Sequence, residues 1–179
     1  MSEAVETITL AGGCFWCVEA VFEQLRGVID VQSGYSNGQT VSPSYEQVCS
    51  GNTGHAEVVR VRFDPEQLPL SDVLKVFFAT HDSTTRNRQG NDVGTQYRSG
   101  IYYSDDAQKA VIDRVVAEAN AELGGKVVTE VARLDNYSAA EGYHQHYFAN
   151  NPTQGYCAAV VGPKVEKFRK VFKDRLVSA

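Results

Sequence analysis

Apolar and polar positions recur along the chain with two periods, and each period predicts a different kind of element. An approximate period of two, clearest over residues 59–64, predicts strands over residues 5–11, 28–35, 59–64, 97–103 and 127–134. A period of three to four predicts helices over residues 14–25, 70–80 and 105–123. Gly162-Pro163 opens a final basic helix, and a capping-box spacing at Ser138 and Glu141 predicts a short helix carrying residues 143–150.

The order of these elements predicts the fold class. Strands and helices alternate irregularly and one pair of strands is joined directly, which favours an α+β fold. We expect a mixed sheet with helices packed on it, a ferredoxin-like or split βαβ core and a long irregular C-terminal segment. No repeat or linker divides the chain, so we expect one catalytic domain over residues 1–179. The polar stretch 81–96 is expected to be a long loop, and such loops are usually functional.

Charge and hydropathy exclude several classes of partner. The chain has 22 acidic and 17 basic residues, a net charge of -5, with no basic block that would favour nucleic acid. The first ten residues lack a secretory signal, and no apolar run approaches the roughly 18 residues that would span a membrane. We therefore expect a soluble, cytoplasmic protein, and a monomer.

Cys14 is the candidate nucleophile among the four cysteines. It follows Gly12-Gly13, which allow a sharp turn from a strand into a helix. The N–H groups and dipole at a helix start favour a thiolate there, and the thiolate is the reactive form. A buried cysteine that packs as a small apolar residue is the alternative. The two glycines and the aromatic pair that follows Cys14 favour the nucleophile.

Cys17 lies three residues after Cys14, so the two thiols are neighbours on a helix. Taken alone, this C-x-x-C spacing indicates a thioredoxin-like redox module or half of a metal site. The second half of a metal site is missing, because the remaining cysteines are isolated and His144 with His146 is not a usual ligand spacing. We expect no metal, and no nucleotide or flavin motif is present.

Several longer motifs resemble the A-type peptide methionine sulfoxide reductases, and they cover nearly the whole chain. They are GGCFWC at 12–17, SYEQVCSGNTGHAE at 44–57, HDSTTRNRQGNDVGTQYRSGIYY at 81–103, EGYHQHYFANNP at 141–152 and GYC at 155–157. The combination in this order is very specific. Ser83 departs from the pattern, because the family often has proline there.

The resemblance implies an enzyme that reduces methionine S-sulfoxide, free or in proteins, and so repairs oxidised proteins. Cys14 attacks the sulfoxide sulfur, and the leaving oxygen needs a proton and hydrogen bonds. By resemblance Glu57 is the acid, Tyr45 and Tyr97 are phenolic donors, and Asp92 orients a water or the substrate. Each has an ordinary alternative, such as a sheet tyrosine or a solvated carboxylate.

Phe15 and Trp16 are the expected substrate-binding wall that holds the S-methyl group. Phe15 fits the helical apolar stripe and could equally be core, whereas Trp16 falls off that stripe. One methyl contact contributes only about 1 kcal/mol, so the pocket must also position the group. Fixing both methyl and oxygen selects one epimer of the chiral sulfur.

Attack leaves Cys14 as a sulfenic acid, which condenses readily with a second thiol. Cys157 is the favoured resolving cysteine and Cys17 its rival, while Cys49 is expected to be a packed structural thiol in a strand. By resemblance thioredoxin then reduces the disulfide, and no other cofactor is implied. For Tyr143, His144, His146 and Tyr147, pocket shaping and simple packing are equal alternatives.

Two other functional classes stay open at this stage. A general dithiol–disulfide exchanger would use Cys14 and Cys17, although the bulky pair between them suits a protein-docking surface poorly. A methionine-binding or redox-sensing domain would need no strained nucleophile, which makes it the weakest of the three hypotheses.

Overall fold

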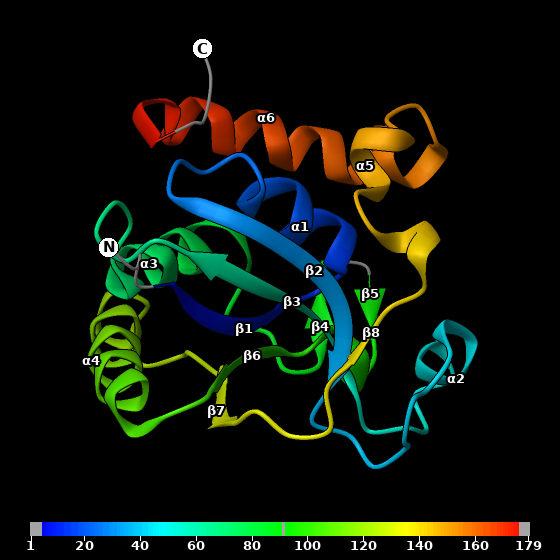
Figure 1. Cartoon of the computed structure of the whole chain (residues 1–179), viewed down its shortest axis with the longest axis horizontal. Helices are drawn as coiled ribbons and strands as arrows, with labels where there is room; N and C mark the ends of the chain where they lie inside the picture. The colour runs from blue at the N-terminus through cyan, green and yellow to red at the C-terminus, as the bar shows by residue number, and fades with distance from the viewer. Residues whose placement is uncertain (1–4, 91, 176–179) are drawn as a thin grey trace.

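Six strands form one sheet in the computed structural model, which describes residues 5–90 and 92–175 (Figure 1). Their spatial order is β7-β6-β1-β3-β2-β8, and every neighbouring pair is antiparallel except β6 and β7. The strands are β1 (Glu6–Gly12), β2 (Val28–Ser36), β3 (Ala56–Phe63), β6 (Ser99–Tyr103), β7 (Glu130–Arg133) and β8 (Ser138–Ala139). The central order β6-β1-β3-β2 is that of a split βαβ core, so the predicted mixed α+β fold is confirmed. The ends of the predicted domain, residues 1–4 and 176–179, lie outside the described residues.

Four longer helices pack on one face of this sheet. They are α1 (Phe15–Phe22), α3 (Leu70–Thr80), α4 (Asp106–Glu122) and α6 (Gly162–Val171). Their apolar side chains meet the inward residues of β1, β2, β3 and β6 in one core, which includes Leu10, Phe22, Val61, Leu74 and Phe168. On the other face, Ala11, Val58 and Tyr102 are covered by Leu134 and Tyr137. Helices predicted from periodicity are thus confirmed, α3 with the predicted bounds.

Short elements occupy the connections, where periodicity predicts least. They are α2 (Tyr45–Cys49), the hairpin β4 (Arg88–Gln89) and β5 (Asp92–Val93), the 3₁₀ turns η1 (Thr95–Tyr97), η2 (Gly142–His144) and η4 (Lys173–Arg175), α5 (Tyr147–Asn150) and the π-helical turn η3 (Cys157–Val161). The expected loop 81–96 therefore contains a hairpin. No helix among the described residues is long and apolar enough to cross a membrane.

Two local expectations are wrong, a strand at Cys49 and a helix cap at Ser138. Cys49 ends a short helix, not a strand, because Ser44 and Gln47 form a capping box at its start. Ser138 forms no such cap with Glu141, since it lies in β8. Glu141 instead accepts hydrogen bonds from the Tyr35 hydroxyl at 2.8 Å and the Tyr45 N–H at 2.9 Å.

Candidate active site

Cys14 stands at the turn from β1 into α1, as the glycines predict. Gly13 has a φ of +93°, and a Cβ there would lie 2.5 Å from Cγ of Gln89, so only glycine fits. Cys14 is the N-cap of α1, and its carbonyl accepts from the N–H groups of Cys17 and Val18 at 3.1 and 3.4 Å. Cys14 therefore stands at the start of the helix.

The electrostatic environment of Cys14 differs from the expected one. Its side chain is only 9% exposed, and this burial raises the pKa of the thiol well above its ordinary value. A hydrogen bond to Cys17 and the charge of Glu57 act in the same direction, and the Trp16 N–H opposes them more weakly. The helix start alone does not produce a thiolate, because desolvation outweighs it. Cys14 is a neutral thiol in this resting site.

Glu57 lies in β3 on the face that carries the helices, one strand away from the start of α1. Its side chain is 1% exposed, which excludes a solvated carboxylate. Its Oε1 atom accepts the Phe15 N–H at 3.1 Å, so the carboxyl lies against the first turn of α1. Burial raises the pKa of Glu57 to about 8, more than the Phe15 N–H lowers it. The group is mostly protonated at neutral pH and can donate a proton.

Tyr45 and Tyr97 face this carboxyl from two short helical turns. Burial, then the charge of Glu57, raises the pKa of both phenols above the ordinary tyrosine value. Both remain neutral hydrogen-bond donors across the physiological range. Asp92 adds a further charge near Glu57 and Tyr97, and one of its oxygens accepts the Tyr156 hydroxyl. The sequence-predicted polar residues are thus brought together around Glu57.

Aromatic rings lie next to these polar groups. Phe15 is fully buried and stacks on Tyr45, with 6.3 Å between ring centroids. Trp16 is half-buried and stacks on Tyr147, with centroids 3.9 Å apart and the planes inclined by 9°. The Trp16 Nε1–H donates to Nδ1 of His144 at 3.1 Å. Phe15 is therefore as much a core residue as a wall, whereas Trp16 is held by the C-terminal part of the chain.

Three thiols gather behind this wall. Cys14, Cys17 and Cys157 belong to one buried apolar cluster with Ala20, Val161 and Val165, and all are free thiols. The Cys14 hydrogen bond, followed by the charge of Lys164, lowers the pKa of Cys17, although burial opposes both. Burial raises the pKa of Cys157. Cys49 is exposed, so the expectation of a packed structural thiol is wrong.

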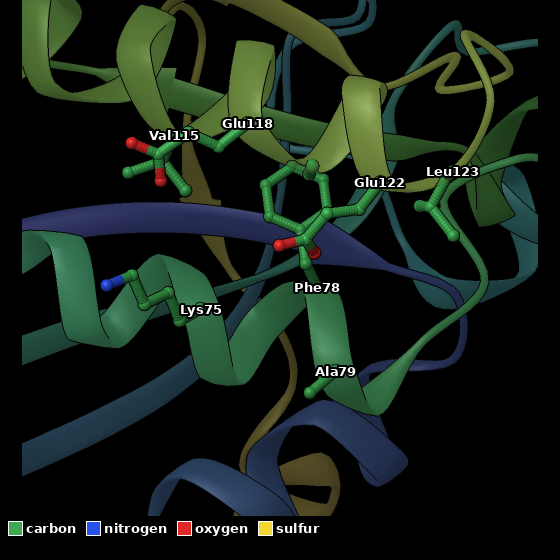
Figure 2. A pocket seen from close by; sticks show the side chains of 8 residues that line it. Lys75, Phe78, Ala79, Val115, Glu118, Glu122 and Leu123 are labelled. Carbon is green, nitrogen blue, oxygen red and sulfur yellow. The ribbon is translucent and has the colours of Figure 1, made fainter.

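Tyr156 and Glu141 also contribute to the site, and sequence reasoning missed both. Tyr156 stands beside Trp16 and hydrogen-bonds to Asp92, and its place in the GYC motif next to Cys157 was an available signal. Glu141 positions Tyr45 through the backbone, but nothing in the sequence pattern marks that contact. By contrast, the cavity between α3 and α4 contains none of the predicted site residues (Figure 2).

One group among the described residues has donor atoms close enough to hold a cation. The atoms of Glu19, Glu23 and His146 lie within 4.8 Å of one another. Both oxygens of Glu19 accept backbone N–H groups, and His146 pairs with Glu23 at 2.7 Å. Hydrogen bonds within the chain therefore account for this group.

Known proteins and a family model match this chain over nearly its whole length. The family described as "Peptide methionine sulfoxide reductase" matches residues 6–176. The peptide methionine sulfoxide reductase MsrA of Psychrobacter sp. (strain PRwf-1) is 54% identical over 172 residues, covering 95% of this chain and 98% of that protein. Reduced Mxr1 from Saccharomyces cerevisiae superposes with a TM-score of 0.80 at 36% identity, over 86% of this chain and 89% of that one. Mxr1 in complex with Trx2 gives a TM-score of 0.56 at 25% identity, covering 80% and 84%.

Proposed function

The chain belongs to the peptide methionine sulfoxide reductase family, and from this premise we propose that it reduces methionine S-sulfoxide, free or in proteins, with Cys14 as the nucleophile. The observation that carries this proposal is the pairing of two neutral groups. A buried thiol at the start of α1 stands beside a buried carboxyl, Glu57, that keeps its proton at neutral pH. The pair can supply a nucleophile and an acid to the same substrate.

The reaction needs one proton moved in each direction. Glu57 gives its proton to the sulfoxide oxygen, and the Cys14 thiol restores that proton as its sulfur attacks the sulfoxide sulfur. The hydroxyl then moves from the substrate sulfur to the Cys14 sulfur as the bond between the two sulfurs breaks, so Cys14 becomes a sulfenic acid and the substrate leaves as a thioether. Cysteine sulfur is oxidised by two electrons and the substrate sulfur is reduced by two. A neutral Cys14 in the resting site is compatible with this sequence, because ionisation is needed only when substrate is present.

The phenols of Tyr45 and Tyr97 stabilise the charge that develops on the sulfoxide oxygen. Both are neutral donors close enough to Glu57, on α2 and η1, for its charge to raise their pKa. Asp92 orients a water or the substrate, and its hydrogen bond with Tyr156 fixes its carboxylate. These roles are those expected from the sequence, and the clustering of the groups supports them.

Phe15 and Trp16 form the apolar wall for the S-methyl group. A pocket that fixes the methyl against these rings and the oxygen against the donors accepts one configuration at sulfur, the S epimer. The stacking of Trp16 on Tyr147 supports its part, because a ring held on two sides is pre-organised for binding.

Cys157 condenses with the sulfenic acid of Cys14, forming a disulfide and releasing water. Its membership in the same buried cluster as Cys14 supports this choice over a remote thiol. Cys17 is in that cluster too and hydrogen-bonds to Cys14, so it remains the rival. A thioredoxin, the kind of partner suggested by the Trx2 complex of yeast Mxr1, returns the enzyme to its reduced form. The protein acts as a single-domain cytoplasmic monomer without another cofactor.

The activity test uses a racemic methionine sulfoxide derivative with a thiol reductant. We expect half of the racemate, the S epimer, to be consumed, and Cys14→Ser to remove turnover. Cys49→Ser, which changes an exposed thiol, is the matched control and should retain activity. Full consumption of both epimers, or an active Cys14→Ser variant, would refute the proposal.

Peptide mapping separates the two resolving candidates. After one turnover without reductant, the Cys14 peptide should be joined to the Cys157 peptide. A bridge between Cys14 and Cys17 would assign resolution to Cys17, and an unbridged Cys14 would refute both assignments.

A further inference from the structure

Helix α1 carries a buried carboxylate that the chemistry above does not use. Glu19 is 1% exposed, and burial raises its pKa to about 7. Its two oxygens accept the backbone N–H groups of His146 at 2.9 Å and Tyr147 at 3.3 Å. A buried carboxylate is costly unless hydrogen bonds satisfy it, so the Glu19 carboxylate depends on these two N–H groups.

These two N–H groups begin α5, which lies beside α1 (Figure 1). His146 has a φ of +55° and a ψ of +35°, a left-handed conformation that costs a non-glycine residue about 1–2 kcal/mol. The Glu19 carboxylate therefore holds the chain at the one point where the start of α5 is strained. Glu23, one turn later on α1, pairs with the His146 imidazole on the exposed side and does not touch the backbone.

Tyr147, one of the two residues whose N–H group Glu19 accepts, also packs on Trp16 of the proposed substrate wall. Trp16 and Glu19 are three residues apart on α1, so both side chains face the same side of the helix. Tyr147 places its amide on Glu19 and its ring on Trp16, with the ring centroids 3.9 Å apart. A shift of α5 would move this ring and expose one side of the indole.

We propose that Glu19 is a positioning residue that holds the start of α5 so that Tyr147 fixes Trp16 as a wall of the substrate site. This proposal rests on the proposed function for its effect on catalysis. Its structural half, the link from Glu19 through Tyr147 to Trp16, does not depend on any turnover. The carboxylate acts at a distance from the reacting sulfur and carries no proton in the reaction.

Fluorescence tests the structural half directly, because Trp16 is the only tryptophan in the chain. In Glu19→Gln one acceptor becomes an amide donor that faces an N–H group, so α5 should loosen. We expect the emission of Trp16 to shift to longer wavelength and its quenching by acrylamide to increase. Glu23→Gln is the matched control, and its emission should equal that of the parent protein. Equal emission from Glu19→Gln and the parent would overturn the proposal.

Steady-state kinetics tests the catalytic half. Loss of a pre-organised wall should raise KM for the sulfoxide about fivefold and change kcat by less than about twofold. The effect should not add to that of Tyr147→Leu, because both substitutions break the same link. An additive double variant, or a fall in kcat with KM unchanged, would contradict the assignment. If the parent protein shows no turnover while the fluorescence result holds, the proposed function fails and the structural link stands.

Two further measurements keep the outcome decisive. Should Glu19→Gln fail to fold, Glu19→Asp keeps the charge but is one methylene too short to reach both N–H groups, and the same shifts are expected from it. Addition of Mg²⁺, a hard cation that carboxylates bind and thiols do not, should leave the emission of the parent protein unchanged. A response would indicate that Glu19, Glu23 and His146 bind a cation, which would overturn the assignment.

Discussion

Residues 6–133, here called the framework, and residues 134–156, the C-terminal segment, are held in place by different interactions. The framework consists of strand ladders and helices that share one apolar core, to which Phe168 of α6 also contributes. The segment has few regular elements, and apart from the two-residue strand β8 and the stacking of Tyr147 on Trp16 it is fastened by single polar side chains. Glu141 binds Tyr35 and Tyr45, Gln145 binds both backbone groups of Ser33, and Glu19 binds the start of α5.

This contrast separates stability from substrate binding. The framework carries Cys14 and Glu57 and therefore the bond-making chemistry. The C-terminal segment supplies the rings and hydrogen bonds around Trp16 and therefore contributes to substrate binding. Substitutions in the framework core or at its reacting groups should lower stability or kcat, whereas substitutions in the segment, or at Glu19, which holds it, should raise KM and loosen the segment locally.

The largest effect is expected from the framework core. Phe77 in α3 is 1% exposed, so Phe77→Ala should reduce the free energy of unfolding by about 4 kcal/mol, through lost burial and the cavity that remains. Denaturant unfolding measures this change. Phe78→Ala on the same helix is the control, because Phe78 borders the cavity of Figure 2 and is only partly buried. Equal losses for both variants would contradict the assignment of the core to this face of α3.

Glu57→Gln tests whether the framework supplies the proton. We expect kcat to fall about 100-fold with the fold intact, because an amide cannot act as the acid. In the parent protein, kcat/KM should fall as the pH rises through about 8, since Glu57 loses its proton above its raised pKa. The variant should lack this alkaline decline. Glu46→Gln, an exposed carboxylate on α2, should keep both the rate and the decline.

An alkaline decline that persists in Glu57→Gln would assign the titration to another group and remove Glu57 from the role of acid. A decline on the acid side of pH 7 would contradict the sign of the pKa shift.

Gln145→Ala tests the C-terminal segment. Its side chain accepts the Ser33 N–H and donates to the Ser33 carbonyl, both at 2.9 Å. Removing it leaves the Ser33 N–H unpaired, while the Ser33 carbonyl keeps its hydrogen bond from the Ala140 N–H, and the loss should cost about 1–2 kcal/mol. Hydrogen exchange should show lost protection around residues 142–150, while core strands keep their protection. The same variant should have a raised KM. Asn150→Ala, an exposed position in the same segment, is the control. Faster exchange throughout the sheet would show that segment and framework are one cooperative unit.

The different forces explain how far the sequence predicts each region. Alternating residues such as Val59, Val61 and Phe63 record which face of β3 is buried, so strands and helices of the framework can be found from period alone. Glu141 and Gln145 act through backbone groups more than 90 residues away in the chain. No local pattern specifies such contacts, which is why a capping box was expected at Ser138 instead.

The site shows the same division. Gly13 and Cys14 predict the turn and the nucleophile because their roles depend on local backbone geometry. The ionisation of Cys14 was predicted in the wrong direction, because burial depends on residues that fold over it from distant parts of the chain. The helix α2 could have been predicted, since Ser44 and Gln47 have the spacing of a capping box.

The smallest effect is expected at Ser83, where the chain departs from the proline common in the family. Its side chain is 2% exposed, and its hydroxyl has no hydrogen-bond partner. An unpaired buried hydroxyl costs free energy, so Ser83→Ala should leave stability unchanged or raise it by about 0.5 kcal/mol. Denaturant unfolding measures this, with Ser99→Ala as control, because the Ser99 hydroxyl bonds to His81 and Thr129 and its loss should destabilise. A loss of stability in Ser83→Ala would mean that this hydroxyl is satisfied by a hydrogen bond in solution.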